Sequence, residues 1–108
     1  MSHFNIANQL MKIEEYNEAK VYYLKAINID PDYQKAHGNL AVVYELLGEF
    51  DEAITHYQMD ISLGSTNGGA HFNLSRVLKT INQLEASRYH YEIAVSINPA
   101  LKNLNSGI

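Results

Sequence analysis

The sequence predicts an all-α protein, a right-handed α-solenoid of three helix-turn-helix repeats. Two observations support this prediction. A shift of 34 residues superimposes the chain on itself twice, and apolar residues within each period recur at spacings of four and three. The equivalent sets include His3, His37 and His71; Asn5, Asn39 and Asn73; Tyr23, Tyr57 and Tyr91; and Pro31, Ser65 and Pro99. We therefore assign one domain to residues 1–101, with repeats at about 1–33, 34–67 and 68–101, and a tail at 102–108 that begins an incomplete fourth repeat or a cap.

Each repeat is predicted to contain two helices, because its apolar periodicity breaks once and then restarts. The breaks lie at residues 14–15, 48–49 and 82–83. Asn17 and Asp51 are expected to cap the second helices of the first two repeats, and the Asp30-Pro31 and Asn98-Pro99 pairs to end second helices. The predicted helices are residues 2–14, 17–30, 36–47, 51–63, 70–81 and 85–97.

Composition limits the classes of function. A hydrophobic content of 46% with 19% charged residues is typical of a folded chain, and the absence of cysteine fits a reducing, cytoplasmic location. The formal net charge is -4 and the eight Lys and Arg residues form no cluster, so we expect no nucleic-acid partner. No apolar stretch approaches the roughly 20 residues of a membrane span, so we expect no membrane partner.

The pattern of small and large residues resembles the tetratricopeptide repeat family over nearly the whole chain. In the middle repeat the matching residues are Leu40, Ala41, Tyr44, Gly48, Phe50, Ala53 and Tyr57. Small residues such as Ala7 and Ala19 would let the two helices of one repeat approach closely, while larger residues fill the space between repeats. The sequence departs from the family at its three leading histidines, at Ser65 and at Asp60.

The resemblance implies a concave groove, lined by the first helix of each repeat, that binds an extended peptide. On the family pattern the groove residues are Phe4, Asn5, Asn8, Met11 and Lys12; Lys35, Gly38, Asn39, Val42 and Glu45; and Phe72, Asn73, Arg76 and Lys79.

Three asparagines in register are the most informative part of this set. A side-chain amide both donates and accepts hydrogen bonds, so Asn5, Asn39 and Asn73 can pair with the backbone of any peptide. The arrangement resembles the asparagine ladder in the tetratricopeptide region of O-linked N-acetylglucosamine transferases. The alternative is that these amides bond only to neighbouring helices or to water.

The carboxylate clamp of the same family, which holds acidic chaperone tails with two asparagines and three basic residues, is matched only in part. Asn8 and Asn39 fit the pattern. The basic positions instead hold Phe4, Gly69 and Asn73, so we expect no standard clamp. Arg76 and Lys79, one helical turn apart, either favour an acidic ligand at that end of the groove or are two solvated cations.

The periodic histidines are expected to pack structurally and not to bind metal. Equivalent residues of neighbouring repeats lie about 8–10 Å apart, too far to share an ion whose ligands lie at about 2 Å. His56 and Asp60 form a weaker exception at helical spacing. We find no nucleophile motif, phosphate loop or acid–base pair, and interpret residues 64–69 as a loose turn between repeats, so we expect neither cofactor nor enzyme activity.

The sequence therefore favours a protein-interaction module or scaffold. Two alternatives stay open: the chain is the substrate-recruiting arm of a larger enzyme such as a glycosyltransferase, or it is a self-assembling structural unit.

Two further expectations concern single sites. Asp60 replaces a small residue, and it either pairs with His71 of the next repeat or reaches solvent. The C-terminal face, formed by residues such as Ala94, Ile97 and Leu101, is expected to lack a cap. Ile108 falls on the Ile6, Leu40 and Leu74 position, which indicates a fragment of a longer protein, with self-association in the absence of the remainder.

Overall fold

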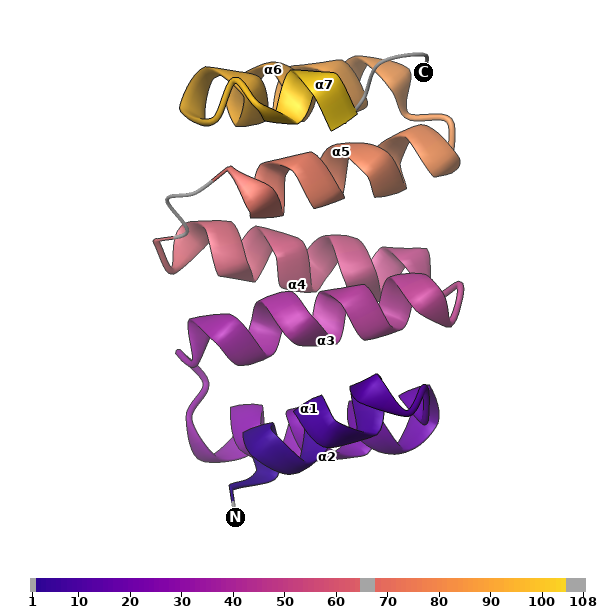
Figure 1. Ribbon diagram of the computed structural model, residues 1–108, viewed down its shortest axis with the longest axis vertical. Helices are drawn as coiled ribbons and strands as arrows, with labels where there is room; N and C mark the ends of the chain where they lie inside the picture. Colours follow the sequence, from indigo (N-terminus) through magenta and orange to yellow (C-terminus); the bar gives the residue numbers. More distant parts are fainter. Residues whose placement is uncertain (1, 65–67, 105–108) are drawn as a thin grey trace.

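The computed structural model describes residues 2–64 and 68–104, which form a single stack of helices (Figure 1). The helices are α1 (His3–Lys12), α2 (Tyr16–Ile29), α3 (Gln34–Leu46), α4 (Phe50–Ser62), α5 (Gly69–Thr80), α6 (Leu84–Ile97) and the short α7 (Leu101–Leu104). All six predicted helices are present, with ends within two residues of the prediction. Each packs chiefly on its neighbours in chain order, and the stack runs along the longest dimension, 39 Å.

The helices pair into three units: unit 1 (α1 and α2), unit 2 (α3 and α4) and unit 3 (α5 and α6). The turn inside each unit is closed by one residue with positive φ: Glu14 at 61°, Gly48 at 77° and Asn82 at 66°. In unit 1 the Glu15 amide donates to the Leu10 carbonyl over 2.9 Å, and units 2 and 3 repeat this bond. This left-handed closure satisfies helix-end carbonyls and lets the next helix start within two residues.

This turn explains why the predicted N-caps are wrong. Glu15 and Glu49 occupy the cap positions of α2 and α4, without side-chain capping bonds. Asn17 and Asp51 lie one residue inside the first helical position. A carboxylate in the first turn, such as Asp51, still interacts favourably with the positive end of the helix dipole.

The core follows the predicted alternation of small and large residues. Ala7 and Ala19 are fully buried between the helices of unit 1, and Ala41 and Ala53 are fully buried in unit 2. In unit 3 the equivalent residues are serines, and the hydroxyl of Ser87 donates to the carbonyl of Ser75 over 2.7 Å. The largest fully buried side chains are Tyr23, Tyr57, Leu40 and Leu74. These side chains fill the space between the close helix pairs.

The connections that follow the second helices differ along the chain. After α2 the Asp32 amide donates to the Asp30 carboxylate over 3.2 Å, and after α6 the Ala100 amide donates in the same way to Asn98. Both turns end their helices as the Asp-Pro and Asn-Pro pairs predicted. After α4, Gly68 has a φ of 80° and is close to α6. Of the predicted loose turn, residues 65–67 lie outside the described residues.

The C-terminal end differs from the expected bare face. Ala94 is fully buried and Leu101 partly buried, whereas Ile97 is 42% exposed. Ala94 is buried because the turn before α5 approaches α6 there: a Cβ added to Gly68 would lie 3.0 Å from the Ala94 carbonyl oxygen. Helix α7 packs on α6, and Ile108 lies outside the described residues. Over residues 2–64 and 68–104, no helix combines the length and apolarity needed to cross a membrane.

Candidate peptide-binding groove

Two hollows lie along the first helices of the units. The first has a volume of about 540 Å³ and lies between α1 and α3, with one contribution from α2. Its lining contains six of the predicted groove residues, Asn5, Asn8, Met11, Lys12, Asn39 and Val42, together with Gln9 and Tyr23.

The second hollow has a volume of about 330 Å³ and extends from α1 across α3 and α4 to α5. Asn39 and Val42 line both hollows, so the two form one continuous groove. The predicted groove residues Phe4, Lys35, Gly38 and Asn73 also line the second hollow. Its other lining residues are Gln34, Tyr57, Asp60, Gly69 and Ala70.

Units 1 and 2 meet at the groove through a neutral cluster, the first seam, made of Asn8, Tyr23 and Asn39. The side-chain amide of Asn39 donates to the side-chain oxygen of Asn8 over 3.0 Å, and the Tyr23 hydroxyl donates to the same oxygen. Tyr23 is almost fully buried, and burial raises its pKa above the usual value. The hydrogen bond therefore satisfies a hydroxyl that has no access to water.

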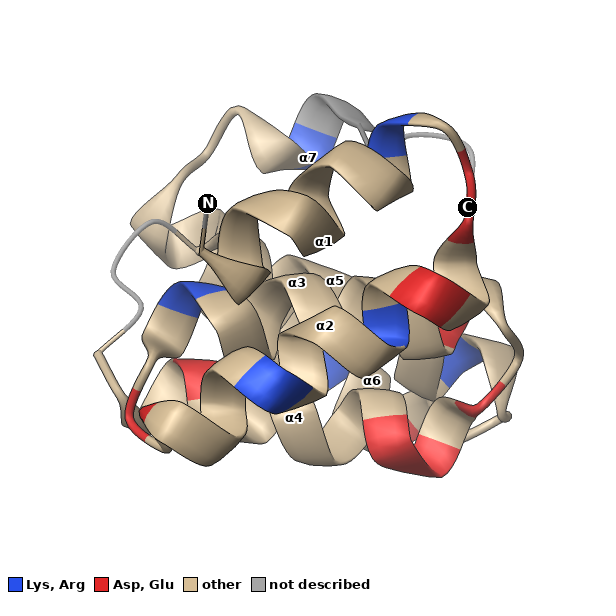
Figure 2. Cartoon of the chain, turned by 90° about the horizontal axis from the view of Figure 1, so that it is seen from below, with Lys and Arg blue, Asp and Glu red and all other residues tan. Residues whose placement is uncertain are grey.

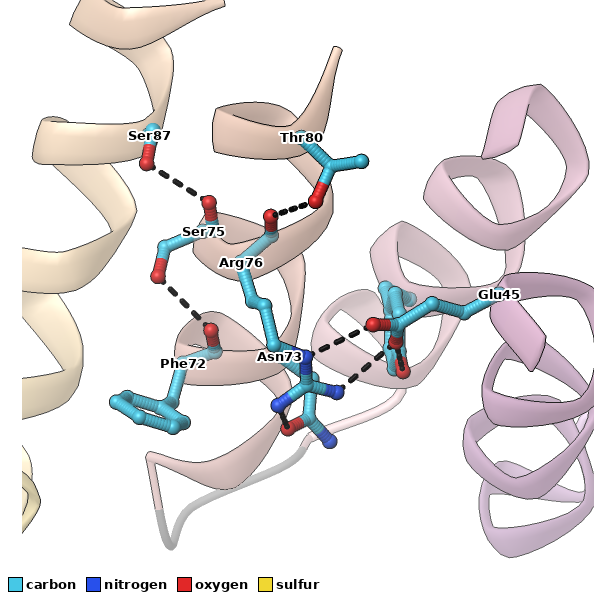
Figure 3. A network of polar contacts seen from close by, with 8 residues as sticks. Glu45, Phe72, Asn73, Ser75, Arg76, Thr80 and Ser87 are labelled. Atoms are coloured by element: carbon cyan, nitrogen blue, oxygen red, sulfur yellow. Dashed lines mark hydrogen bonds and ion pairs between the residues drawn. The ribbon is translucent and has the colours of Figure 1, made fainter. Parts of the chain in front are cut away.

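Units 2 and 3 meet through a charged cluster, the second seam, made of Glu45, Tyr57 and Arg76. The Arg76 guanidinium donates to both carboxylate oxygens of Glu45, over 2.8 and 2.9 Å (Figure 3). The Tyr57 hydroxyl donates to the same carboxylate over 2.9 Å. Burial, and then the negative charge of Glu45, raise the pKa of Tyr57 well above its usual value. The phenol therefore stays protonated and acts as a donor.

Arg76 is therefore not a free cation available to an acidic ligand, because it pairs with Glu45. Its side chain is still 48% exposed, so it is in part the solvated cation that the sequence allowed. Lys79 lies exposed near the end of α5. Phe72 is partly buried, and its ring points away from Arg76 in Figure 3. Phe72, Arg76 and Lys79 line neither hollow.

The three ladder asparagines occupy different environments. Asn5 is exposed, and its side chain has no hydrogen-bond partner within residues 2–64 and 68–104. Asn39 uses one N–H on Asn8, and the Asn73 oxygen accepts from Arg76 over 3.1 Å. A side-chain amide offers two N–H groups and one oxygen, so each retains hydrogen-bonding capacity toward the groove.

Asp60 does not form its predicted pair with His71, and it is only partly exposed to solvent. Its carboxylate accepts a hydrogen bond from the Gln34 side chain over 2.9 Å, within its own unit. His71 instead lies against His90, with 2.9 Å between their Nδ1 atoms. The predicted tie between units 2 and 3 through Asp60 and His71 is therefore wrong, because each residue finds a partner on the adjacent helix of its own unit.

Units 2 and 3 each contain a histidine pair inside the unit. The Nδ1 atoms of His37 and His56 are 2.9 Å apart, as are those of His71 and His90. One ring must donate and the other accept, so the pair requires at least one neutral imidazole. Burial lowers the pKa values of His56, His71 and His90, and the partner's charge lowers those of His56 and His90 further. In unit 1 the corresponding pair is His3 and Tyr22, with ring centroids 5.9 Å apart.

Metal ligands do not gather in the part of the chain that the structure describes, since no three His, Cys, Asp or Glu residues there could hold one ion. Basic and acidic residues are scattered over several helices (Figure 2). The chemistry that the groove offers is therefore hydrogen bonding from amides, apolar contact and isolated charges.

Sequence reasoning missed the contributions of the second helices to the groove. Tyr23, Tyr57 and Asp60 line the hollows from α2 and α4, although the prediction placed only first helices there. A signal for one of them, Asp60, was present in the sequence. Phe4 and Ala26 in the first repeat correspond to Gly38 and Asp60 in the second, so small and large residues have exchanged helices. The exchange opens the groove at Gly38.

Comparisons with known proteins agree with this architecture. One tetratricopeptide repeat model matches residues 1–33 and a second matches residues 22–55. No curated protein was found to match the sequence. Solved structures do match, and each of the three described next covers 90% of this chain.

The structure titled "First TPR of Spaghetti (RPAP3) bound to HSP90 peptide SRMEEVD" is 23% identical, with a TM-score of 0.85 and 77% of its own length covered. MamA is 23% identical, with a TM-score of 0.87. YrrB, described as a TPR protein with an unusual peptide-binding site, is 26% identical, with a TM-score of 0.83. The chain spans 57% of MamA and 50% of YrrB. The family models and these neighbours together show that the chain contains tetratricopeptide repeats and folds as an all-α tetratricopeptide solenoid.

Proposed function

We propose that the chain is a protein-interaction module whose groove binds an extended segment of a partner protein. The observation that supports this most directly is the continuity of the groove. Asn39 and Val42 line both hollows, Asn5 lies in the first and Asn73 in the second. A peptide that follows the groove would pass all three amides.

The amides suit recognition of backbone, in the manner of the asparagine ladder that the sequence resembles. The free groups are the whole amide of Asn5, the oxygen and one N–H of Asn39, and both N–H groups of Asn73. Backbone groups of an extended peptide need both donors and acceptors. Two structural neighbours support the use of such a surface, since one is bound to a peptide and the other is described as having a peptide-binding site.

The experiment is a selection of displayed random peptides against the purified chain, followed by calorimetric titration of a selected synthetic peptide. We expect Asn5→Ala and Asn73→Ala together to weaken binding by roughly tenfold, because each lost hydrogen bond is worth about 0.5–1.5 kcal/mol. Asn39 is left intact because it also supports Asn8.

The matched control is Asn17→Ala with Asn28→Ala, which removes two exposed amides from α2 instead of the groove. We expect this control to leave affinity unchanged. Equal affinity of the groove variant and the wild type, or equal losses in groove and control variants, would show that the amides do not bind the peptide.

A further inference from the structure

An exchange of residue size in unit 2 creates a polar recess in the middle of the groove. Units 1 and 3 have phenylalanine in the first helix and alanine in the second, as Phe4 and Ala26 show. Unit 2 has Gly38 and Asp60 at these positions. Both Gly38 and Asp60 line the second hollow. Unit 2 therefore has a carboxylate at this hollow and lacks the aromatic ring that unit 1 contributes there through Phe4.

The backbone does not require glycine at residue 38, but the missing side chain makes room for the Asp60 carboxylate. Gly38 lies inside α3, and its φ is not positive, so helix geometry alone does not call for glycine there. A glycine in a helix interior costs about 1 kcal/mol relative to alanine. A Cβ at residue 38, however, would lie 2.7 Å from Asp60 Oδ2. The Asp60 carboxylate therefore lies directly against α3 at Gly38, and both residues line the hollow.

The Asp60 carboxylate is only half satisfied. Oδ1 accepts from Gln34, whereas Oδ2 has no hydrogen-bond donor among the residues that the structure describes. Within the same residues, the ion pairs are Lys20 with Glu49 and Arg76 with Glu45, so no Lys or Arg neutralises Asp60. Burial raises the pKa of Asp60 above its usual value. A partly buried carboxylate in this state is stabilised by a cation.

The walls of the hollow also suit a cationic side chain. Phe4 contributes an aromatic ring, and such rings attract Lys and Arg through their negative faces and pack on aliphatic stems. Tyr57 also lines the hollow, but the residue is only 1% exposed. Lys35 lies exposed at the same hollow and repels a second cation, so one basic residue fits better than a run of them. The formal net charge of -4 favours approach of a basic segment.

We propose that the second hollow is a specificity pocket for one lysine or arginine side chain of the bound peptide, with the Asp60 carboxylate as its ionic partner. This rests on the proposed function: the asparagine amides hold the peptide backbone, and Asp60 selects a residue. An acidic side chain at that place would be repelled by the Asp60 carboxylate.

The test uses the same peptide selection, carried out in parallel on the wild type, Asp60→Asn and Asp51→Asn. Both substitutions remove one carboxylate from α4, but Asp51 is exposed and lines neither hollow. We expect wild type and Asp51→Asn to enrich Lys or Arg at one fixed peptide position, and Asp60→Asn to lose that enrichment while still selecting peptides.

A double-mutant cycle between the peptide lysine and Asp60 measures the strength of their contact. Replacing the enriched lysine by glutamine in a synthetic peptide should weaken binding to the wild type roughly five- to tenfold, and binding to Asp60→Asn less than twofold. Thermal unfolding monitored by circular dichroism checks that Asp60→Asn is folded. Equal effects of the peptide change on both proteins, or no basic preference, would overturn the pocket while leaving peptide binding intact. Failure to select any peptide whose binding depends on Asn5 and Asn73 would overturn both proposals.

Discussion

The two seams of the stack use one geometry with two chemistries. In each, a buried tyrosine of a second helix donates to an oxygen that also receives a donor from the first helix of the following unit. The first seam achieves this with the Asn8 amide, and the second with the Glu45 carboxylate. The neutral seam contains one amide–amide bond, whereas the charged seam contains a two-pronged ion pair. Neighbouring units can therefore have the same packing and respond differently to charge, salt and substitution.

The largest expected effect is that of Glu45→Ala. The substitution leaves the Tyr57 hydroxyl buried without its acceptor and Arg76 without its partner. Loss of hydrogen bonds to a charged group costs about 1.5–3 kcal/mol, so we expect the free energy of unfolding in urea to fall by about 2 kcal/mol. The same measurement on Arg76→Ala and on the double variant gives the coupling energy. Purely additive losses would contradict a direct Glu45–Arg76 bond.

Acidification should destabilise units 2 and 3, which meet at the second seam, to similar extents. At the first seam it should destabilise unit 2 more than unit 1. Units 2 and 3 contain histidine pairs, whereas unit 1 contains His3 and Tyr22. The lowered pKa values of His56, His71 and His90 mean that the unfolded chain binds more protons than the folded one below about pH 6.5. Stability is thus full above about pH 6.5 and is lost as the pH falls from there through the folded-state pKa values.

Urea unfolding at a series of pH values checks this, with His56→Tyr and His90→Tyr as variants that copy the unit 1 pair. We expect a loss smaller than that of Glu45→Ala in the wild type, and a flatter pH profile in the double tyrosine variant. An unchanged profile would assign the acid sensitivity to other groups.

At the first seam, Asn8→Ala should cost about 1 kcal/mol, roughly half the effect at Glu45. The substitution removes a neutral acceptor, and the Asn39 amide is at the groove, where water can replace the lost bond. Most of the loss in unfolding free energy comes from the Tyr23 hydroxyl, because it is buried and loses its acceptor. A loss as large as that of Glu45→Ala would mean that charge does not distinguish the two seams.

The smallest expected effect is that of Lys20→Ala. Lys20 and Glu49 are 3.4 Å apart, and their side chains are 25% and 39% exposed. Ion pairs of this kind contribute about 0.2–1 kcal/mol, and salt screens them. We expect a loss of about 0.3 kcal/mol that vanishes in about 1 M sodium chloride, while the effect of Glu45→Ala persists in part. Persistence of the Lys20 effect in salt would indicate packing of its stem on Tyr44 instead.

The helices could be predicted because their signal is periodic and local. Apolar residues at spacings of three and four predict a helix wherever they occur, and a 34-residue shift shows the same pattern three times. The predicted caps at Asn17 and Asp51 were wrong for a local reason too. In the first repeat the left-handed residue is Glu14, so no glycine marked the end of the turn before α2. In the second repeat Gly48 did mark it, and α4 begins at Phe50, one residue before Asp51.

The side-chain partners could not be predicted, because they depend on how first helices of adjacent units pack. Asn8 with Asn39 and Glu45 with Arg76 are both 31 residues apart, which is one period of 34 less about one helical turn. Comparison of equivalent positions, 34 apart, does not reveal this offset. Asp60 was recognised as unusual, but its partner depends on Gly38, which only the packing of α3 on α4 explains.

The 31-residue offset has a consequence for the order of the units. If unit 3 were joined directly to unit 1, Arg76 would face Met11, which stands where Glu45 stands in unit 2. The guanidinium would lose its partner, although the helices still fitted. Asn73 is equivalent to Asn39 and would still reach Asn8, so the second seam, and not the first, specifies which unit follows which. A chain with reordered units would keep its helical packing and lose this ion pair.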